Sequence, residues 1–591
     1  MVFSLGNSYQ TVPLDQAISL DTLVQPLQPD NSVGASAVIH HLLKEDHHPP
    51  LYFVLVHWWM QLFPISGKYI SLGAARSLPA LFGVVSIPAV YGLGFLAFRS
   101  RLVAQLAAAM MAVSPYSIFL AQEARHYALG ILWVIASLCC LVVAVQHLKR
   151  QTPLPIWVAL CWVVVNSLGI ATHYFFSLTL CAEAMVLIGN WGWRRRLEGK
   201  MQEPRATRYI PASPSLPVSP SPIANPHSSG WRILAVAAGT LVGCLVWVPV
   251  WQAGANSEMT QWIISSNRSF LSLLNPIFQA LAAWITMMSL LPVEASSLLV
   301  VIVSGAVMIV FFFWVLPILY RGLEAQLKQP DTRLATGVLG GFVIGAIALF
   351  FGITYFLGTD LTRGARYNFV YFPAVIVLLG AAIALSWNTS PILNSKPRVD
   401  TKTPHRESTT LFRINGKPAV VLIWLMGLLS GITVVSNLGY QKYYRPDLLV
   451  PAIQQASSVP ILIATTHNTL VQTGEMMGLA WEFRRAADEK KLPVNPQFLL
   501  AHQDQDRCPS DNQPVSSPQE TVCPASTTLL QTLAQLPRPL DLWLVNFKAP
   551  VEPEAPNCFA EDASQYLTSV DGYENRLYHC LAVNSNAARR L

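Results

Sequence analysis

Charged residues are scarce in this chain. They make up 12% of its 591 residues, whereas soluble globular domains carry roughly 25%. The deficit is uneven, because apolar runs of about 20 residues, the length that crosses a bilayer core, alternate with short polar segments. A backbone within lipid must satisfy its own hydrogen bonds, so we predict that these runs are helices. The scarcity excludes an ordinary soluble protein and predicts an all-α polytopic membrane protein.

About ten of the apolar runs are long enough to cross a bilayer. They lie at 78–98, 103–119, 124–146, 153–172, 174–192, 232–252, 295–319, 335–357, 368–387 and 419–437. We group them as a first transmembrane core, 78–192, and a second set of spans, 232–437. Between them, residues 193–231 include a Pro/Ser-rich stretch that cannot form a core, which predicts a disordered cytoplasmic linker.

Lysine and arginine gather in every second loop. These loops lie at 99–101, 149–150, 194–232, 321–333 and 396–417, whereas the alternate loops hold only Arg125, Arg268, Arg363 and Arg366. Basic loops face the cytoplasm. The charge pattern therefore predicts that residues 1–77, 253–294 and 438–591 lie on the extracytoplasmic side. The net charge of +7 is explained by topology and does not indicate a nucleic-acid partner.

Residues 1–77 are predicted to form an outer-face loop. Within it, 51–64 is apolar but too short to span, and it carries Trp58 and Trp59, so we predict an interfacial helix. No signal peptide begins at Met1. Because nothing apolar precedes this loop to carry it across the membrane, we expect a first span that is missing from this sequence.

The region 438–591 is predicted to be a small extracytoplasmic α/β domain. The stretches 460–466, 497–503 and 540–547 favour buried strands, and 473–490 and 527–536 favour helices between them. The region lacks a Gly-rich phosphate loop and metal-ligand spacing. Cys508, Cys523, Cys558 and Cys580 allow one or two disulfides if the compartment is oxidising. The other cysteines lie within apolar runs, as small hydrophobic residues do.

Polar and ionisable residues gather at five places on the predicted outer face. Taken singly, each has an ordinary explanation as a solvated loop charge, a helix start or an aromatic belt. Taken together on one face, they indicate a shared cavity. The places are 13–17, 45–52, 114–127, 172–174 and 360–367.

The stretch from about 13 to 190 resembles the GT-C glycosyltransferases, in particular glycosyltransferase family 39 and its polyprenyl-phosphate-sugar-dependent relatives. These relatives include the protein O-mannosyltransferases and the lipid A aminoarabinose transferases. The resemblance rests on LDQAISL, HPPLY before an aromatic-rich helix, Arg76 before a small-residue span, SP followed by QEARHY, and THY, in this order. Later in the chain, GARYNFVYFP resembles the family's Arg-Tyr element.

This resemblance implies a membrane glycosyltransferase that moves a hexose or pentose from a polyprenyl phosphate to an acceptor with inversion. Asp15 matches the family's aspartate and would be the general base. Arg125 and Arg366 would bind the phosphate leaving group. The substrate-binding candidates are Gln16, His48, Glu123, Arg125, Tyr127, His173, Tyr174, Arg366 and Tyr367. No cofactor is expected, and the sequence offers no ligand set for a metal. The expected partners are the lipid-linked donor, membrane lipids and an acceptor that is a protein, a lipid or a glycan.

Two alternatives stay open at this stage. A transporter or flippase of lipid-linked glycans would have a similar number of spans, but it predicts ionisable groups within them and an internal repeat. The sequence favours neither, because the spans are almost free of charged residues and their lengths do not repeat. A non-catalytic descendant of the family is the other alternative. It is favoured by Gln16, which replaces the family's usual glutamate, and by the absent first span.

Overall fold

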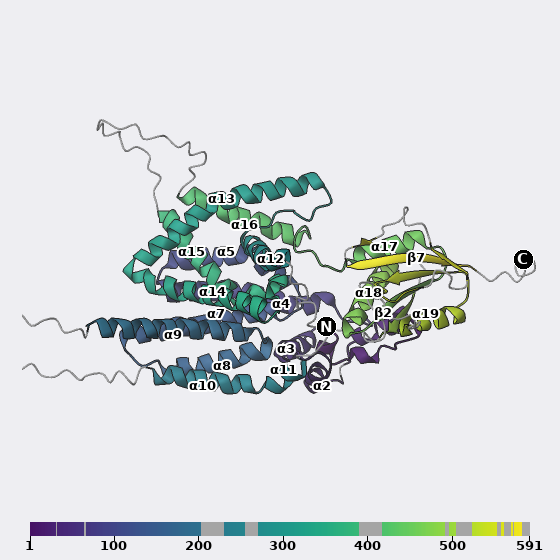
Figure 1. The fold of residues 1–591 in the computed structure, drawn as a ribbon, viewed down its shortest axis with the longest axis horizontal. Coiled ribbons are helices and arrows are strands. Elements are labelled where there is room, and N and C mark those ends of the chain that lie inside the picture. The colour runs from purple at the N-terminus through teal and green to yellow at the C-terminus, as the bar shows by residue number, and fades with distance from the viewer. Residues whose placement is uncertain are drawn as a thin grey trace, which may run out of the picture. The chain divides into compact units, whose positions relative to one another are not determined.

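A computed structural model gives the fold of the chain (Figure 1). It describes residues 1–30, 32–63, 67–201, 230–254, 270–388, 416–490, 496–503, 523–551, 557–560, 569–570 and 572–581. The chain divides into two compact units. The membrane unit comprises Leu42–Met60 and Leu72–Gln441, and the sheet unit comprises Met1–His41, Gln61–Ser71 and Lys442–Leu591.

The membrane unit is built of helices. Their bounds are α3 Leu51–Met60, α4 Leu72–Phe98, α5 Arg101–Val113, α6 Pro115–Gln122, α7 Tyr127–Arg150, α8 Ile156–Thr172, α9 Phe176–Met201, α10 Trp231–Leu245, α11 Val248–Gly254, α12 Phe270–Met288, α13 Leu298–Lys328, α14 Pro330–Phe356, α15 Phe372–Asn388 and α16 Lys417–Val435. Short helical turns η7 Leu361–Arg363 and η8 Ala365–Val370 precede α15. Every apolar run predicted to be a span contains a helix.

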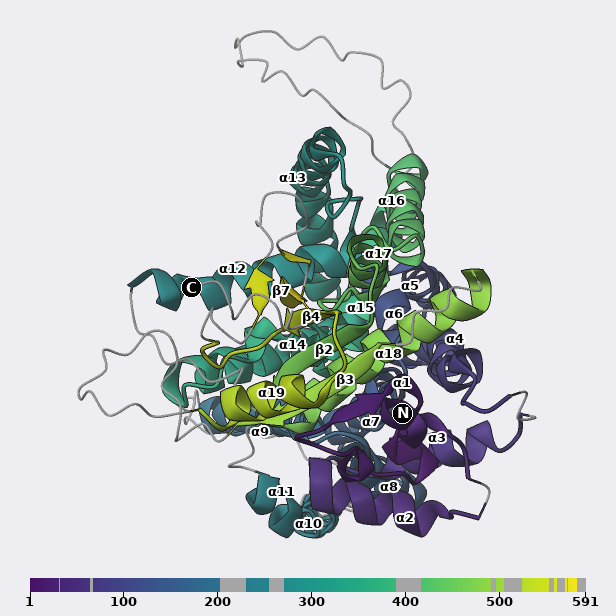
Figure 2. The same cartoon turned by 90° about the vertical axis from the view of Figure 1, so that its right-hand side faces the viewer.

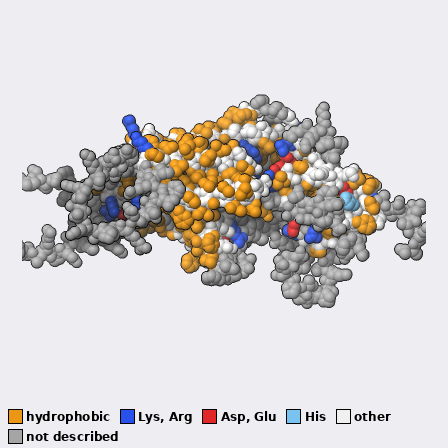
Figure 3. Space-filling model, turned by 90° about the horizontal axis from the view of Figure 1, so that it is seen from above, with side chains coloured by type: hydrophobic (Ala, Val, Ile, Leu, Met, Phe, Trp, Pro, Cys, Tyr) orange, Lys and Arg blue, Asp and Glu red, His pale blue; other side chains and the backbone are white. Residues whose placement is uncertain are grey.

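The protein is a membrane protein. Within the described residues, α4, α7, α13, α14 and α16 are long and apolar enough to cross a bilayer. Helices α5 and α6, bent by 53° at their junction, meet the same test only as a pair, which is the pattern of a broken span or a re-entrant loop. The other predicted spans are shorter apolar helices. Hydrophobic side chains cover much of the visible face of the membrane unit (Figure 3), as lipid contact requires.

One helix of the membrane unit was not predicted. The interval 253–294 was expected to be an outer-face loop, but α12 occupies Phe270–Met288. Asn275, Pro276 and Gln279 interrupt its apolar sequence, so no continuous apolar run marks it. Proline is tolerated in such helices because neighbouring groups satisfy the freed backbone.

Helix α15 forms the core of the membrane unit. Its residues from Phe372 to Ala384 are almost all buried. Small residues permit this packing, because a Cβ on Gly380 would lie 2.7 Å from the Ala107 nitrogen, and one on Gly322 of α13 would lie 2.3 Å from the Ala382 carbonyl oxygen. Close backbone approach through small residues is a usual source of helix association in membranes.

The predicted helix over 51–64 is present as α3. Tyr52 and Val56 on this helix are buried against Leu78 and Leu129, whereas Trp58 is 55% exposed. One side of α3 therefore packs on the membrane unit and the other does not. Its placement at a membrane interface stays a prediction.

The sheet unit contains the predicted α/β domain. Its strands are β1 Ala17–Ser19, β2 Ile461–His467, β3 Gln497–His502, β4 Leu540–Val545, β5 Cys558–Ala560, β6 Ser569–Val570 and β7 Tyr573–Cys580. They run in the order β1-β3-β2-β4-β7-β5, with β6 also paired to β7. Strands β3, β2 and β4 are mutually parallel, and the remaining pairs are antiparallel.

Helices cover both faces of this sheet. Met476 and Phe483 of α18 Leu470–Lys490 pack on the face that includes Ile463. Leu529 of α19 Pro524–Gln535 packs on the opposite face with Leu462. Figure 2 shows α18 and α19 beside β2 and β3. Because β3 and β4 flank β2 on opposite sides, the parallel part is a small doubly wound sheet.

The N-terminal region differs from the predicted organisation. Residues 1–77 were predicted to be a loop separate from 438–591, but Met1–His41 and Gln61–Ser71 belong to the sheet unit. The physical reason is β1, whose Ala17 pairs with Leu499 of β3. Val12, Leu23 and Val24 add to the same hydrophobic cluster as Phe498. Such pairing between distant segments leaves no local pattern in the sequence.

The cysteines follow the predicted division. Cys558 and Cys580 form a disulfide between β5 and β7, and Cys523 is also disulfide-bonded. Cys508 and most of the predicted linker, 202–229, lie outside the described residues. The membrane-unit cysteines are free thiols: Cys139, Cys140, Cys161, Cys181 and Cys244.

Candidate functional site

Three histidines of the membrane unit lie together at the ends of its helices. His48 precedes α3, His126 immediately precedes α7, and His173 immediately follows α8. The ring centroid of His126 lies 5.8 Å from that of His48 and 4.4 Å from that of His173. We call these residues the histidine cluster. Three helix ends thus converge on one point.

A break in the chain positions His126. Helix α5 ends at Val113, and Ser114 caps the next helix by accepting a hydrogen bond from the Ser117 N–H. The Ser114 hydroxyl also donates to the Met287 carbonyl at 2.9 Å, and Pro115 suits a first helical turn. Because α6 is short, the chain turns again after Gln122 and brings His126 to the start of α7.

A tight turn between α8 and α9 positions His173. The His173 N–H donates to the Gly169 carbonyl at 3.0 Å, and a Cβ on Gly169 would lie 2.5 Å from the Phe176 ring, so this position requires glycine. The Nδ1 atom of His173 accepts a hydrogen bond from the Phe175 N–H at 3.0 Å. The neutral ring then carries its proton on Nε2.

Aromatic rings surround the histidine cluster. The ring centroid of Tyr127 lies 4.5 Å from His126, and that of Phe369 lies 5.2 Å from His173. The ring centroid of Tyr367 lies 6.3 Å from His173. Tyr367 and Phe369 belong to η8, so this distant loop contributes to the same cluster.

The histidines have different protonation tendencies. Burial, reinforced by neighbouring histidines and by Arg366, lowers the pKa of His126 and of His173 well below the usual value. Burial also lowers the pKa of His48, but the Asp46 carboxylate, 2.9 Å from its Nδ1, outweighs burial, and the net direction is upward. Near neutral pH the cluster therefore contains two neutral rings beside one that is easier to protonate.

Two arginines act on this cluster from separate segments. Arg125 is exposed and Arg366 is half-buried. Both guanidinium groups help to lower the pKa of His126. The Arg366 carbonyl accepts a hydrogen bond from the Tyr116 hydroxyl at 2.9 Å, which fixes the backbone of this loop. Arg363, in the same loop, instead pairs with Asp360 at 3.4 Å.

Several buried polar atoms around the cluster are unsatisfied. Within the described part of the chain, neither ring nitrogen of His126 has a hydrogen-bond partner, although this side chain is only 3% exposed. Asp46 Oδ1 and the hydroxyls of Tyr52 and Tyr174 are also unpartnered. An unsatisfied buried polar group costs about 1–3 kcal/mol. A polar ligand or water would remove this penalty.

The predicted site residues divide between the two units. The membrane unit holds His48, Glu123, Arg125, Tyr127, His173, Tyr174, Arg366 and Tyr367, and the sheet unit holds Asp15 and Gln16. Asp15 is exposed, and its carboxylate accepts a 2.7 Å hydrogen bond from the His502 N–H. Gln16 is also exposed. The catalytic role of Asp15 stays a prediction.

The sequence-based choice of residues omitted His126, Asp46 and Tyr52. All three stood within the motifs already noted, QEARHY for His126 and the 45–52 segment for the others. The ring of His126 lies against those of His48, Tyr127 and His173. His126 could have been selected from the sequence because it lies between Arg125 and Tyr127, which were both expected to bind substrate.

A metal centre is not evident in the described ranges. There, no three histidine, cysteine, aspartate or glutamate side chains converge as metal ligands would. The histidine cluster itself is packed ring against ring, and one nitrogen of His173 is already used by the backbone.

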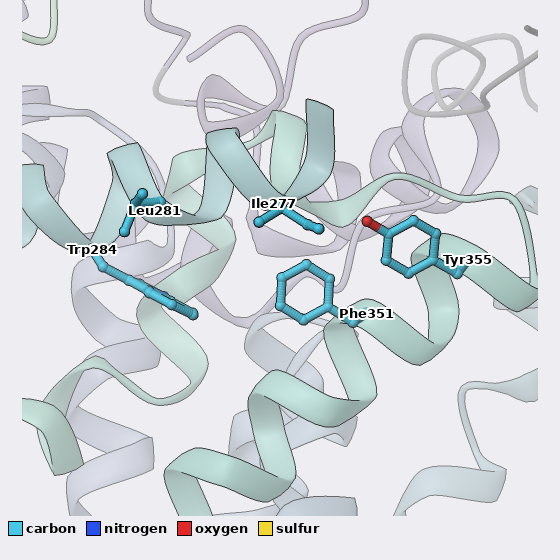
Figure 4. Close-up of a pocket in the computed structure, with 5 residues that line it drawn as sticks. All are labelled: Ile277, Leu281, Trp284, Phe351 and Tyr355. Atoms are coloured by element: carbon cyan, nitrogen blue, oxygen red, sulfur yellow. The ribbon is translucent and has the colours of Figure 1, made fainter. Parts of the chain in front are cut away.

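An apolar groove lies between α12 and α14 (Figure 4). It has a volume of about 350 Å³ and is lined by Ile277, Leu281, Trp284, Phe351 and Tyr355. A smaller pocket shares Trp284 and Phe351 and reaches Thr362 and Asn368. Those residues belong to η7 and η8, the loop that carries Arg366. The groove therefore leads from an apolar helix surface towards a basic loop.

Comparison with solved structures finds two glycosyltransferase groups. ArnT from Cupriavidus metallidurans in the apo state is 12% identical, covers 91% of this chain and 88% of its own, and gives a TM-score of 0.45. ArnT from the same organism bound to undecaprenyl phosphate is 14% identical, covers 98% of this chain and 94% of its own, and gives 0.44. No family model and no curated protein matches the chain.

A second group is the oligosaccharyltransferase AglB from Archaeoglobus fulgidus. Its complex with an inhibitory peptide and a dolichol phosphate is 14% identical, covers 73% of this chain and 56% of its own, and gives a TM-score of 0.34. All three TM-scores are below 0.5. The roles of residues are therefore argued from the geometry of this chain.

Proposed function

We propose that this protein transfers a sugar from a polyprenyl-phosphate carrier to an acceptor on the extracytoplasmic face of the membrane. The convergence of Arg125, Arg366 and the histidine cluster supports this most directly. The leaving group of such a reaction is a lipid phosphate, and arginine binds phosphate through paired N–H donors. Neutral His126 and His173 would donate hydrogen bonds to the phosphate or the sugar without requiring a further counter-ion.

The apolar groove between α12 and α14 supports a lipid-linked donor. Its lining is hydrophobic, and its smaller extension reaches Thr362 in the loop of Arg366. An isoprenoid chain gains about 0.8 kcal/mol for each buried CH₂. Undecaprenyl phosphate and dolichol phosphate, which occur in the solved ArnT and AglB complexes, are therefore suitable first probes.

Asp15 is our proposed general base. It would take the proton of the acceptor hydroxyl or amine as the nucleophile attacks the anomeric carbon. The bond from that carbon to the phosphate oxygen would break in the same displacement, which gives inversion, and the phosphate would leave with the electron pair. The exposed carboxylate of Asp15 retains acceptor capacity, since its Oδ1 accepts one hydrogen bond from the described residues, from the His502 N–H.

The extracytoplasmic location rests on charge and on cysteine chemistry. The alternating basic loops favour this orientation. The sheet unit contains a disulfide between Cys558 and Cys580, whereas the described cysteines of the membrane unit are free thiols. A disulfide is typical of an oxidising compartment. Both observations favour placing the sheet unit outside the cytoplasm.

Binding of undecaprenyl phosphate tests this proposal. Full-length protein in lipid nanodiscs should bind the probe in native mass spectrometry, and Arg125→Ala with Arg366→Ala should weaken binding at least tenfold, since charged hydrogen bonds contribute about 1.5–3 kcal/mol each. Arg363→Ala is the matched control, because Arg363 pairs with Asp360 in the same loop. Equal binding by all these proteins would refute the donor site.

A second candidate, a flippase of lipid-linked glycans, is favoured by one observation. Glu183 lies within α9 and is 3% exposed, with Oε2 3.0 Å from the Ser137 hydroxyl and Oε1 unpartnered among described residues. Ionisable groups inside membrane helices often mark transport pathways. Lipid flipping in liposomes without glycosidic bond formation, lost in Glu183→Gln, would favour this candidate over transfer.

A further inference from the structure

The parallel strands of the sheet unit end in polar residues that the donor site does not use. β2 ends at His467 and β3 ends at His502, and these two residues are register partners. Asp15 lies at the same edge, because it accepts a hydrogen bond from the His502 N–H at 2.7 Å and donates its own N–H to the Leu500 carbonyl at 3.0 Å. Ligands of doubly wound sheets bind outside the carboxyl ends of the strands.

Three polar atoms at this edge are unsatisfied. Among the residues that the structure describes, His467 Nδ1, Asn468 Oδ1 and Gln503 Oε1 have no hydrogen-bond partner. His467 is 7% exposed and Gln503 is 8% exposed. The Gln503 N–H donates to the His467 carbonyl at 3.1 Å, which holds these residues side by side. Since buried polar groups are normally paired, this concentration indicates a position for a ligand.

The chemistry of this edge is that of hydrogen-bond acceptance. Asn468 and Gln503 present carboxamide oxygens, and Asp15 presents a carboxylate. His467 Nε2 lies 2.9 Å from the Thr473 hydroxyl, which leaves Nδ1 for another partner. Burial, then the neighbouring His502, lowers the pKa of His467, so its ring is neutral near pH 7.

The described lysine near this edge has its charge compensated. Lys548 follows β4, and its ammonium group is 2.8 Å from the Glu574 carboxylate. The residues with unsatisfied atoms are neutral, and Asp15 is an acid. An anionic ligand would therefore meet no favourable charge from these side chains, whereas a neutral ligand with several hydroxyl donors would match their acceptors.

We propose that Asp15, His467, Asn468 and Gln503 form a sheet-edge site that binds a hydroxyl-rich ligand, a glycan or polyol. Hydroxyls of the ligand donate to the Asn468, Gln503 and Asp15 oxygens, and His467 Nδ1 completes the set. Within the proposed function this ligand is the acceptor, because Asp15 belongs to the same edge. The identification of the ligand as the acceptor rests on the proposed function. The binding of a hydroxyl-rich ligand at the sheet edge does not.

Saturation-transfer NMR on full-length protein tests the sheet-edge site. The protein is placed in phosphatidylcholine nanodiscs, because maltoside detergents would compete as sugars, and methyl mannoside and methyl glucoside are the probes. The wild type should show saturation transfer to at least one probe. Gln503→Met and Asn468→Leu should each weaken binding about tenfold, because each removes an acceptor oxygen. Gln531→Met, at an exposed position on α19, is the matched control and should bind normally.

The outcomes separate this inference from the proposed function. Absence of saturation transfer to either glycoside in the wild type overturns it, as does unchanged binding by both variants. Glucosamine is added as a cationic comparison. If it binds while neither glycoside does, and salt abolishes its binding, the inference is also overturned, because that result describes an ammonium site at Asp15. Asn468→Leu, at a partly exposed position, keeps the test valid if Gln503→Met fails to fold. Arg125→Ala should lose donor binding but retain glycoside binding, so either proposal can fail alone.

Discussion

The membrane unit and the sheet unit bring their histidines together in different ways. In the membrane unit, His48, His126 and His173 stand at helix ends and pack against aromatic rings. In the sheet unit, His467 and His502 stand at the ends of paired strands, beside acceptor side chains. The first arrangement concentrates positive charge from two arginines, whereas the second concentrates acceptors. The membrane unit therefore suits an anionic ligand, and the sheet unit suits a ligand that donates hydrogen bonds.

The two units also differ in what stabilises them. The sheet unit buries large side chains on both faces of its sheet, so apolar area removed from water provides its stability. The membrane unit relies on close helix contact at small residues such as Gly380 and Gly322, because lipid is as apolar as the helix surface. Substitutions can separate these contributions.

The largest effect is expected at Asp15, the proposed general base, in the sheet unit. Asp15→Asn should reduce sugar transfer by about 10²–10⁴-fold, the usual contribution of a general base, and leave undecaprenyl phosphate binding unchanged. Transfer is measured with a lipid-linked sugar donor and the acceptor found for the wild type. Asp30→Asn is the control, because that exposed carboxylate accepts hydrogen bonds only from Ser32 in the described chain. Full transfer by Asp15→Asn would show that Asp15 is not the general base.

A core truncation should affect the sheet unit alone. Phe498 on β3 is fully buried, and its ring lies 6.4 Å from that of Phe483. Phe498→Ala should lower the free energy of unfolding by about 3–5 kcal/mol, measured as faster hydrogen exchange in β2 and β3 peptides. Phe559→Ala, at a position 61% exposed, should leave exchange unchanged. Faster exchange throughout the membrane unit would contradict the division into two units.

Overpacking should affect the membrane unit in turn. A side chain at Gly380 meets the Ala107 backbone, so Gly380→Val should cost about 1–3 kcal/mol and lower the melting temperature of the nanodisc-embedded protein. Gly337→Val on α14 is the control, since nothing lies within 4 Å of a Cβ there. Equal melting of both variants would show that close contact of α15 and α5 contributes little.

The smallest expected effect concerns His126. Because both ring nitrogens are unsatisfied in the described structure, His126→Phe should raise stability by about 1 kcal/mol while weakening donor binding.

The pH dependence of stability gives a second measurement on this variant. The folded pKa of His126 is lowered, so the unfolded chain binds protons first as pH falls below about 6.5, and stability decreases in acid. His126→Phe should reduce this loss of stability in acid. Thermal melts between about pH 7.5 and 5.5, which bracket the ordinary histidine pKa of roughly 6.5, measure it. His147→Phe, at the other end of α7, should retain it.

Much of the fold follows from local sequence patterns. The apolar runs predicted the membrane helices, and β2, β3 and β4 stood out as continuous apolar stretches. Helix α12 was not predicted, because polar residues and a proline divide its apolar sequence. Strand β1 was not predicted, because three residues are too few to show the alternation typical of a strand. Its partner, β3, is also far away in the sequence.

The candidate site was predictable to a similar extent. His48, Arg125, His173 and Arg366 were expected on one face, and the structure gathers them in one unit through helix ends. The carboxyl edge of the sheet was not expected, because His467 and Gln503 belong to no familiar motif. Their significance depends on unsatisfied hydrogen bonds, which a linear sequence cannot display.

Strand β1 has a consequence for biosynthesis. Ala17–Ser19 pair with Gln497–Leu499, so a ribosome completes the whole membrane unit before this strand can find its partner. The early segment must then be kept from pairing elsewhere while the helices insert, since unpaired strands promote aggregation. The edge that carries Asp15 is thus finished only when the last part of the chain arrives. Partly made or prematurely terminated chains would lack this edge, which links the proposed activity to completion of synthesis.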